Sequence, residues 1–294
     1  MSTTAGPSDQ LTIVQLTDTH ITAGGTLVHD AVDTLDSLRH TLDRIVGSGR
    51  RVDALVLSGD LTDNGAPEAY RRLRAVVEPA AAALGARIVY AMGNHDERTA
   101  FGTELCGRSS TKDGGGLTAP YDAVHEVHGL RIVVLDSTTP GRHEGWLTDN
   151  QLNWLRGTLS RPSARGTLLV LHHPPIPSPV TTVNYLRLQE PDRLAAVLAG
   201  SDVRMILCGH AHLTGTGAVA GIPVWVGPAL SYRVDPMAPV GRHRGHVGYG
   251  FTRIDVLGDA VVATAVEATP AEVVYDIPEQ DMLDRLRALA LEAG

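Results

Sequence analysis

Five short apolar segments rich in β-branched residues constrain the fold of this 294-residue chain more than any other feature. Apolar runs of this length, bounded by glycine and polar residues, are typical of buried β-strands. Segments with helical periodicity separate several of them, and such alternation favours an α/β fold. The expected strands are Leu11–Leu16, Ala54–Leu57, Arg87–Met92, Gly166–Leu171 and Val203–Cys208.

Amphipathic segments predict the helices that alternate with these strands. Apolar residues recur at helical spacing in these segments, and two of the segments begin with proline, which suits the first helical turn. Pro79 should kink or split the helix that contains it, because proline removes a helical hydrogen bond. The expected helices are Asp30–Val46, Pro67–Leu84, Thr148–Leu159 and Pro191–Leu198.

The later part of the chain is richer in strands. Further strands are expected at Arg131–Asp136, Ile222–Val226, Phe251–Val256 and Ala260–Ala268. The turn Leu257-Gly258-Asp259 should join the last two as a hairpin. We therefore expect an α/β fold in which two mixed sheets pack as layers flanked by helices.

The pattern also predicts the domain organisation. We expect a flexible N-terminus over residues 1–10, one domain over 11–270 and a helical tail over 271–294. The apolar stripe of the tail helix, Glu279–Glu292, should dock on the body, and pairing with another subunit is the second interpretation. The segment Arg98–Tyr121 has the least pattern, so we expect a loop beside the site, with a lid role left open.

Composition narrows the class of protein. No apolar run approaches the length of a membrane span, and Met1–Gln10 lacks the apolar core of a signal peptide, so we expect a cytoplasmic protein without a membrane partner. A net charge of −8 argues against binding a long nucleic acid polymer, which requires a basic surface. The two cysteines, Cys106 and Cys208, predict neither a disulfide framework nor a zinc knuckle.

Each of the five apolar strands is followed by a motif with metal-binding side chains. Because ligands bind beyond the carboxyl ends of strands in α/β sheets, these motifs should converge on one crevice. Their oxygens and imidazole nitrogens suit divalent transition ions. The motifs are Asp18-Thr19-His20, Gly59-Asp60-Leu61-Thr62-Asp63, Gly93-Asn94-His95-Asp96, His172-His173-Pro174-Pro175 and Gly209-His210-Ala211-His212.

One arrangement of two metal ions uses every proposed ligand. A carboxylate has two oxygens, so Asp60 can bind one ion through each of them. The first ion would take Asp18, His20, His212 and one oxygen of Asp60. The second ion would take the other oxygen of Asp60 together with Asn94, His172 and His210.

Such a centre predicts hydrolysis of phosphate esters by a hydroxide that bridges the ions. Divalent ions lower the pKa of bound water toward about 7 and hold phosphoryl oxygens for in-line attack. His95 would face the phosphate, where it would stabilise the developing charge or protonate the leaving oxygen. Asp63 would orient a ligand histidine or bind the attacking water.

Several other residues are assigned by their positions. We expect Asn94, His95, His143 and His212 to contact the substrate. His173 should be structural, and Tyr232 with Arg233 should lie on a solvated loop. The cluster that contains His243 and His246 is expected on the surface, as are His29, His40, His125 and His128.

The five motifs, in this order, resemble those of the calcineurin-like metallophosphoesterase superfamily, whose pattern is D-x-H, G-D-x-x-D, G-N-H-D/E, H and G-H-x-H. The resemblance spans Asp18–His212. It implies a four-layer α/β/β/α sandwich of two mixed β-sheets flanked by helices, with the ligand roles given above. Asp63 stands where purple acid phosphatases carry an iron-binding tyrosine, which argues against that branch.

Within the superfamily, the stretches Leu16–His20, Met92–Asp96 and Leu171–Pro177 look most like the class III cyclic nucleotide phosphodiesterases. That resemblance implies Mn, Fe or Zn as the two ions, and it makes a homodimer an option. It also implies small soluble phosphodiesters as substrates, first 3′,5′- or 2′,3′-cyclic nucleotides such as cAMP. Alternatives are a glycerophosphodiesterase, a phosphomonoesterase or a nuclease, and, from another class, a non-catalytic scaffold.

Overall fold

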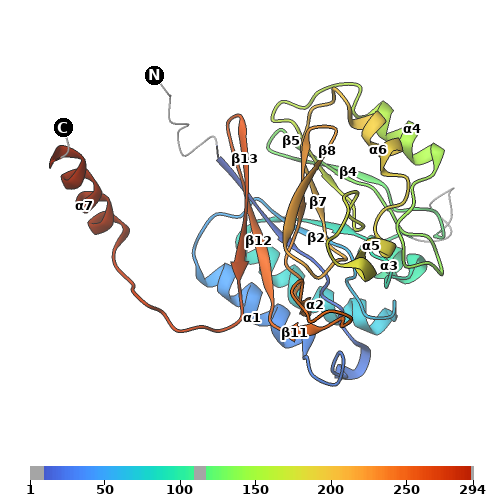
Figure 1. Cartoon of the computed structure of the whole chain (residues 1–294), viewed down its shortest axis with the longest axis horizontal. Coiled ribbons are helices and arrows are strands. Elements are labelled where there is room, and N and C mark those ends of the chain that lie inside the picture. The colour runs from blue at the N-terminus through green and yellow to red at the C-terminus, as the bar shows by residue number, and fades with distance from the viewer. Residues whose placement is uncertain (1–9, 109–116, 293–294) are drawn as a thin grey trace.

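Two β-sheets lie face to face at the centre of the molecule (Figure 1). The computed structural model describes residues 10–108 and 117–292. The first sheet has the strand order β13-β12-β1-β2-β3, in which β1, β2 and β3 are parallel. Its strands are β1 (Gln10–Leu16), β2 (Ala54–Ser58), β3 (Arg87–Ala91), β12 (Gly250–Leu257) and β13 (Ala260–Glu267).

The second sheet has the order β4-β5-β6-β7-β9-β8, and its four central strands are parallel. Its strands are β4 (Ala123–Val127), β5 (Leu130–Val134), β6 (Thr167–Val170), β7 (Val203–Cys208), β8 (Gly215–Val219) and β9 (Ile222–Val226). A separate hairpin pairs β10 (Tyr232–Val234) with β11 (Gly245–Val247). Both sheets are therefore mixed, as the sequence predicts.

Helices cover the outer faces of the two sheets (Figure 1). The first sheet packs against α1 and α2, and the second packs against α4 and α6. The helices are α1 (Thr34–Gly47), α2 (Pro67–Leu84), α3 (Arg98–Leu105), α4 (Asp149–Thr158), α5 (Thr181–Leu186), α6 (Pro191–Leu198) and α7 (Glu279–Glu292), with a short 3-10 turn at Ala23–Gly25. The expected four-layer α/β/β/α arrangement is confirmed.

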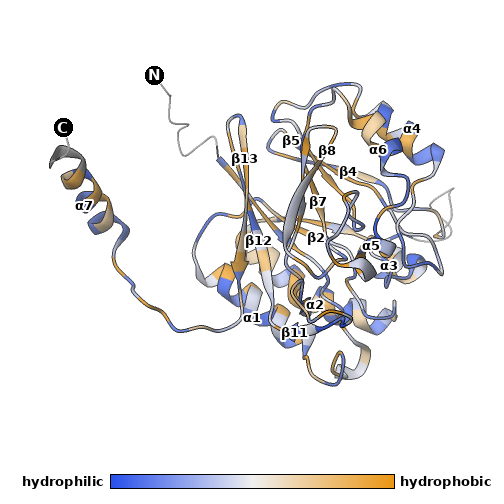
Figure 2. Ribbon diagram, viewed as in Figure 1, coloured by the Kyte–Doolittle hydropathy of each residue, from blue (hydrophilic) through white to orange (hydrophobic). Residues whose placement is uncertain are grey.

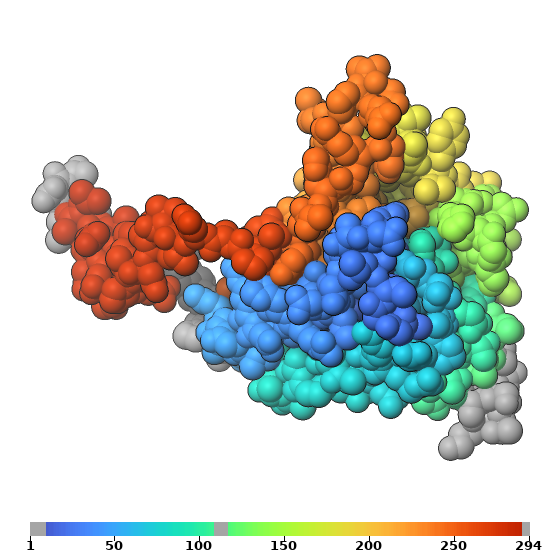
Figure 3. All heavy atoms as spheres, turned by 90° about the horizontal axis from the view of Figure 1, so that it is seen from below, coloured from blue at the N-terminus to red at the C-terminus, as the bar shows by residue number. Residues whose placement is uncertain are grey.

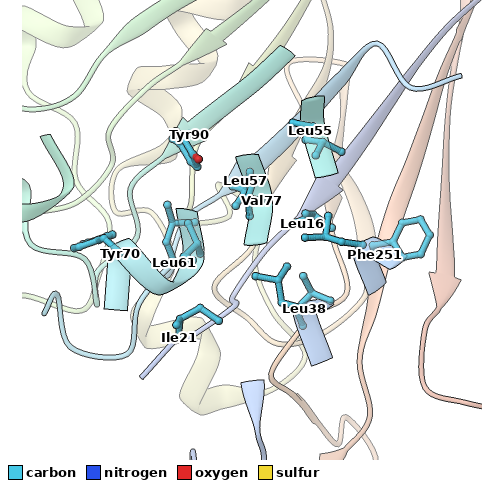
Figure 4. Packing of buried hydrophobic residues seen from close by; sticks show 14 of the residues in the cluster. Leu16, Ile21, Leu38, Leu55, Leu57, Leu61, Tyr70, Val77, Tyr90 and Phe251 are labelled. Atoms are coloured by element: carbon cyan, nitrogen blue, oxygen red, sulfur yellow. The ribbon is translucent and has the colours of Figure 1, made fainter. Parts of the chain in front are cut away.

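Strand alternation explains the three apolar cores between the layers. In β1, Leu11 and Ile13 face the second sheet, whereas Val14 and Leu16 face the helices. Figure 4 shows Leu16 close to Leu38 of α1 in the outer core of the first sheet. Because both faces of the central strands are buried, these strands read as continuous apolar runs.

Capping hydrogen bonds define where the helices begin more precisely than the spacing of apolar residues in the sequence does. The Asp33 side chain accepts a hydrogen bond from the Asp36 backbone N–H, so α1 begins after Asp33 and not at Asp30. Thr148 and Gln151 form a capping box at the start of α4. The α2 helix runs through Pro79 as one helix, so of the two expected effects of this proline, a kink or a split, the split is wrong.

Several short or edge elements were not predicted. The helix α3 occupies part of the expected loop Arg98–Tyr121, because the Glu97 carboxylate caps the N–H groups of Thr99 and Ala100. The edge strands β4 and β8 were missed because their residues alternate between exposed and half-buried and include charged residues or glycine. Residues 109–116 of the expected loop, and residues 1–9 of the expected flexible N-terminus, lie outside the described residues.

The C-terminal helix α7 stands away from the body at the end of an extended segment (Figures 1 and 3). Figure 2 shows apolar and polar residues along it. The described side chains of α7 are all exposed, including Met282, Leu283, Leu286 and Leu289. The helix is present where the sequence predicts it, but the expected docking on the body is wrong.

Among the described helices, none has the length and apolar character that crossing a bilayer requires.

Candidate metal centre

The carboxyl ends of five parallel strands bring the predicted ligands together between the two sheets. Asp18 and His20 follow β1, Asp60 follows β2 and Asn94 follows β3. The second sheet contributes His172 after β6, and His210 and His212 after β7. The first and last of these motifs meet directly, because the backbone N–H of His210 donates to the Asp18 carboxylate at 2.8 Å.

Most of these ligands sit on unusual backbone. Left-handed conformations with φ of 42–69° are rare for residues other than glycine, and they concentrate at functional sites. They occur at Asp18, His20, Asp60, His210 and His212.

One group of ligands surrounds the position expected for the first ion. The Nε2 atoms of His20 and His212 lie 3.2 Å apart, and Asp18 Oδ1 lies 3.6 Å from His212 Nε2. Spacings of this size are those of donors arranged around one ion at about 2.0–2.2 Å. Asp18, His20 and His212 therefore form a complete three-ligand cluster, and all three are buried.

A second cluster adjoins the first. Asp60, His172 and His210 bring their ligand atoms within 4.8 Å of one another. The Asn94 Oδ1 and His172 Nε2 atoms are buried and have no hydrogen-bond partner among the described residues. A buried acceptor without a partner is costly, so a bound cation at this position accounts for both atoms.

The Asp60 carboxylate lies between the two clusters but uses its oxygens differently from the prediction. Its Oδ2 lies 3.5 Å from His20 Nε2 and 3.3 Å from His172 Nε2. Its Oδ1 accepts a hydrogen bond from the His95 backbone N–H at 2.8 Å. One oxygen therefore faces both clusters, and the expectation of one oxygen for each ion does not match this geometry.

Backbone carbonyls fix the orientation of the ligand imidazoles. His172 Nδ1 lies 3.0 Å from the Ser58 carbonyl oxygen, and His212 Nδ1 lies 3.0 Å from the carbonyl oxygen of Tyr232. With Nδ1 used as a donor, Nε2 carries the lone pair toward the centre. Asp63 Oδ1 lies 3.4 Å from Nδ1 of His20.

Glycine is required where strands approach the centre. A Cβ on Gly93 would overlap the backbone nitrogen of Asp60 and lie 2.8 Å from His172 Nε2. A Cβ on Gly209 would lie 2.7 Å from Asp18 Oδ2. These glycines permit the close backbone approach that assembles the clusters.

The electrostatics of the centre favour cations. Burial opposes the charged form of His172, but the neighbouring carboxylates of Asp60 and Asp18 outweigh it and raise the pKa of His172 to about 9. Burial lowers the pKa of His212 to about 4 and lowers the pKa of His210 as well, so both imidazoles are neutral at pH 7. Neutral imidazoles are the form that binds metal.

His95 and His143 lie at the edge of the centre. His95 Nδ1 is 2.7 Å from the carbonyl oxygen of Asp63, which leaves its Nε2 for other partners. The His95 ring lies edge-on to that of His20, and its ligand atoms can also reach an ion shared with His20 and Asp60. His143 is exposed and its Nδ1 lies 3.3 Å from Asn94 Nδ2. Both residues therefore border the space expected for the substrate.

Asp96 organises the centre, a role that sequence reasoning missed. Its carboxylate accepts hydrogen bonds from the backbone N–H groups of Leu61, Thr62 and Gly93 and from the Tyr70 hydroxyl. It therefore ties the turn after β2 to the turn after β3. The signal was present, since Asp96 completes the motif that contains Asn94 and His95.

The prediction for Tyr232 is wrong. Tyr232 is half-buried, and its ring centroid lies 4.2 Å from that of His212. The short strand β10 was missed, and it holds Tyr232 against the centre through its pairing with β11.

The remaining histidines mostly match their assignments. His173 is buried, with Nδ1 2.8 Å from the Ser137 hydroxyl and Nε2 3.1 Å from the His143 carbonyl oxygen, as suits a structural residue. His125 is half-buried in β4, so the surface assignment for it is wrong. Exposed positions are confirmed for His29, His40, His128, His243 and His246.

Comparison with known proteins agrees with this geometry. The sequence pattern described as calcineurin-like phosphoesterase matches residues 11–213. A probable cyclic nucleotide phosphodiesterase of Rhodococcus erythropolis is 45% identical over 255 residues, which cover 86% of this chain and 82% of that protein. A cAMP/cGMP dual specificity phosphodiesterase of Mycobacterium tuberculosis is 41% identical over 269 residues, which cover 91% of this chain and 83% of that protein.

Solved structures share the fold at low sequence identity. A dimetal phosphatase from Danio rerio aligns with a TM-score of 0.61 at 15% identity, over 88% of this chain and 96% of that chain. A purple acid phosphatase from yellow lupin aligns with a TM-score of 0.60 at 14% identity, over 91% of this chain and 53% of that chain.

Proposed function

Since the chain belongs to the calcineurin-like phosphoesterase family, we propose that it hydrolyses cyclic nucleotides, cAMP and cGMP among them, at a centre of two metal ions. The observation that carries this proposal is the pair of adjoining clusters, Asp18–His20–His212 and Asp60–His172–His210. The relatives at 45% and 41% identity, named for cyclic nucleotides, support the substrate class. The reaction is hydrolysis of a phosphoric diester.

We assign the ligands from the distances around Asp60. Asp18, His20 and His212 hold one ion, and Asn94, His172 and His210 hold the other. Asp60 would serve both ions, because its Oδ2 faces His20 of one cluster and His172 of the other at similar distances. The second oxygen of Asp60 instead anchors the turn that carries His95.

The ions supply two functions when bound: they acidify a shared water and hold the phosphate oxygens. Mn, Fe and Zn all suit a set of imidazole, carboxylate and amide ligands. The residues of the chain fix these ligands in place before binding. The carbonyl oxygens of Ser58 and Tyr232 orient His172 and His212, and Asp63 orients His20.

His95 handles the proton of the leaving group. Its Nδ1 donates to the Asp63 carbonyl, so Nε2 is the atom that exchanges a proton with the departing sugar oxygen. His143 and Asn94 lie on the same side and bind phosphate oxygens. Opening of the cyclic diester therefore yields a nucleoside monophosphate.

Metal analysis and kinetics test this proposal together. The purified chain is loaded with Mn²⁺, Fe²⁺ or Zn²⁺ in turn, and hydrolysis of cAMP, of bis(p-nitrophenyl) phosphate and of a phosphomonoester is compared. We expect about two ions per chain and faster hydrolysis of the diesters. Asp60→Ala should lose bound metal and at least about 10²-fold in kcat. Full activity of that variant, or a preference for the monoester, contradicts the proposal.

A matched control uses a carboxylate outside the centre. Asp43 is exposed on α1, so Asp43→Ala should keep both ions and full activity. The homodimer suggested by the resemblance stays a prediction, and light scattering on the same samples measures it.

A further inference from the structure

A cavity of about 340 Å³ begins at two residues of the proposed centre, Asn94 and His95. Its walls continue through Asn64, Arg98 and Thr139. None of these three residues is a proposed metal ligand. The volume lies within the range of about 300–1,000 Å³ typical of small-molecule sites.

The cavity adjoins the more accessible residues of the centre. Five of the proposed ligands are buried: Asp18, His20, Asp60, His172 and His212. Asn94 and His95 are half-buried, and His143 is exposed on the loop that follows β5. The same loop supplies Thr139 to the cavity wall, so a phosphate held beside Asn94 has the cavity next to it.

Arg98 forms a fixed part of the wall. Its guanidinium donates to the carbonyl oxygens of Thr118 and Thr138 at 2.9 Å and lies 3.2 Å from Asp136. These contacts hold the side chain in place beside the cavity.

Two other cavities do not include any residue of the proposed centre. One of about 360 Å³, lined by Tyr232 and His246, includes none of the proposed ligands. An apolar one of about 230 Å³ beside Ile176 and Ala211 also includes none of them. Of these three cavities, only the one at Asn94 adjoins the reacting atoms.

We propose that this cavity is the nucleoside subsite, which holds the ribose and base beside Arg98. Asn64 and Thr139 contribute an amide and a hydroxyl to the same wall and select nucleotides over simpler diesters. The inference rests on the proposed function, because it places the nucleoside of the cyclic nucleotide whose phosphate binds the metal ions.

Product inhibition separates the subsite from the metal centre. With bis(p-nitrophenyl) phosphate as the substrate, inhibition constants are measured for AMP and for inorganic phosphate. Wild-type protein should bind AMP more tightly than phosphate, because only AMP fills the cavity. Asn64→Ala and Thr139→Val should each raise the inhibition constant for AMP roughly two- to tenfold, which is the scale of one lost hydrogen bond. The inhibition constant for phosphate should not change.

Arg98→Lys also changes the cavity wall but can disturb folding, since Arg98 holds the carbonyls of Thr118 and Thr138. The two wall variants keep the proposal testable if this one does not fold. The matched control is His246→Ala, which alters the cavity beside Tyr232 and should change neither constant.

Three results overturn the subsite: AMP binding no tighter than phosphate, wall variants that weaken both equally, or a loss of AMP affinity in His246→Ala alone. Failure of the proposed function looks different, because the metal-loaded wild type then hydrolyses none of the diesters. In that case calorimetric titration of the metal-loaded variants with AMP gives the same comparison of affinities without turnover.

Discussion

The strained backbone of the ligands has an energetic cost at the scale of single residues. A residue other than glycine in the left-handed region costs of order 1–3 kcal/mol. His210, with φ of 69°, combines this strain with a half-buried side chain. The surrounding hydrogen bonds, such as that from His210 N–H to Asp18, hold the conformation in place.

This strain predicts that glycine is more stabilising than alanine at His210, the reverse of their usual order within a helix. In metal-free protein, His210→Gly should be more stable to urea than His210→Ala by about 1 kcal/mol, because glycine adopts positive φ without strain. The control is His40, which is exposed within α1. There, glycine should be less stable than alanine by about 1 kcal/mol. The same order of stability at both positions contradicts the interpretation.

Asp122 gives a prediction for pH dependence. Burial raises the pKa of Asp122 to about 6, although Gln151 and the Asp136 N–H donate to its carboxylate. An unfolded aspartate ionises near 3.9. Between these pH values the folded state binds more protons, so stability falls as pH rises from about 4 to 6, by about 2–3 kcal/mol.

Asp122→Asn should remove this part of the pH profile. The asparagine oxygen can accept the same two hydrogen bonds, so the variant should exceed the wild type in stability at pH 7 and match it near pH 4. Urea unfolding at several pH values measures the difference. Asp43→Asn, at an exposed position of α1, serves as the control and should follow the wild-type profile. Parallel profiles for Asp122→Asn and wild type count against the prediction.

At the scale of elements, the close approach of β2, β3 and β6 gives the centre its geometry. Gly93 lies in the turn after β3, where a Cβ would overlap the Asp60 backbone nitrogen, so Gly93→Ala should push Asp60 and His172 apart. We expect metal affinity to fall roughly ten- to hundredfold, the scale seen when supporting residues are changed. Metal titration with a competing chelator measures this.

Gly157 provides the matched control for that variant. It lies within α4, and a Cβ there meets no atom within 4 Å. Gly157→Ala should keep full metal affinity and stabilise the fold by up to about 1 kcal/mol. Equal metal affinity in Gly93→Ala and Gly157→Ala would show that strand spacing does not set the centre.

The sequence predicts the strands that are buried on both faces and misses several that are not. Strands such as β2 and β7 are apolar throughout, so their pattern is unambiguous. The edge strand β4 mixes His125 and Glu126 with valines, and pairing with β5 decides its structure. The same reason explains Tyr232, because β10 is only three residues long and depends on β11.

The set of proposed ligands could be predicted from the sequence, because each of these residues follows a recognisable strand. The role of each oxygen in Asp60 was not accessible, since it depends on where the His95 N–H lies after folding. Asp96 was missed for a similar reason. Its partners at residues 61 and 62 become neighbours only when β2 and β3 pair.

At the scale of the whole molecule, the exposure of the C-terminal tail predicts that the body of the protein folds and is stable without it. The described side chains of α7 are exposed, whereas Ala268 is buried against the first sheet. A chain that ends at residue 270 should therefore keep its kcat/KM and change its melting temperature by less than about 2 °C. Differential scanning calorimetry and cyclic nucleotide hydrolysis measure both.

The mass of the truncated chain in solution separates the two interpretations of the tail. A drop from dimer to monomer on truncation would support pairing through α7. A fall in melting temperature of more than about 5 °C without a change in mass would instead show that the helix docks on its own body.

The left-handed turns that carry the ligands create a trade-off between catalytic activity and thermal stability in this protein. A variant with glycine or asparagine at these positions relieves the strain. Such a variant should be more resistant to heat but lose turnover, because it no longer carries the ligands. A search for hardier versions of this enzyme should therefore leave the five turn positions untouched and draw its improvements from the helices.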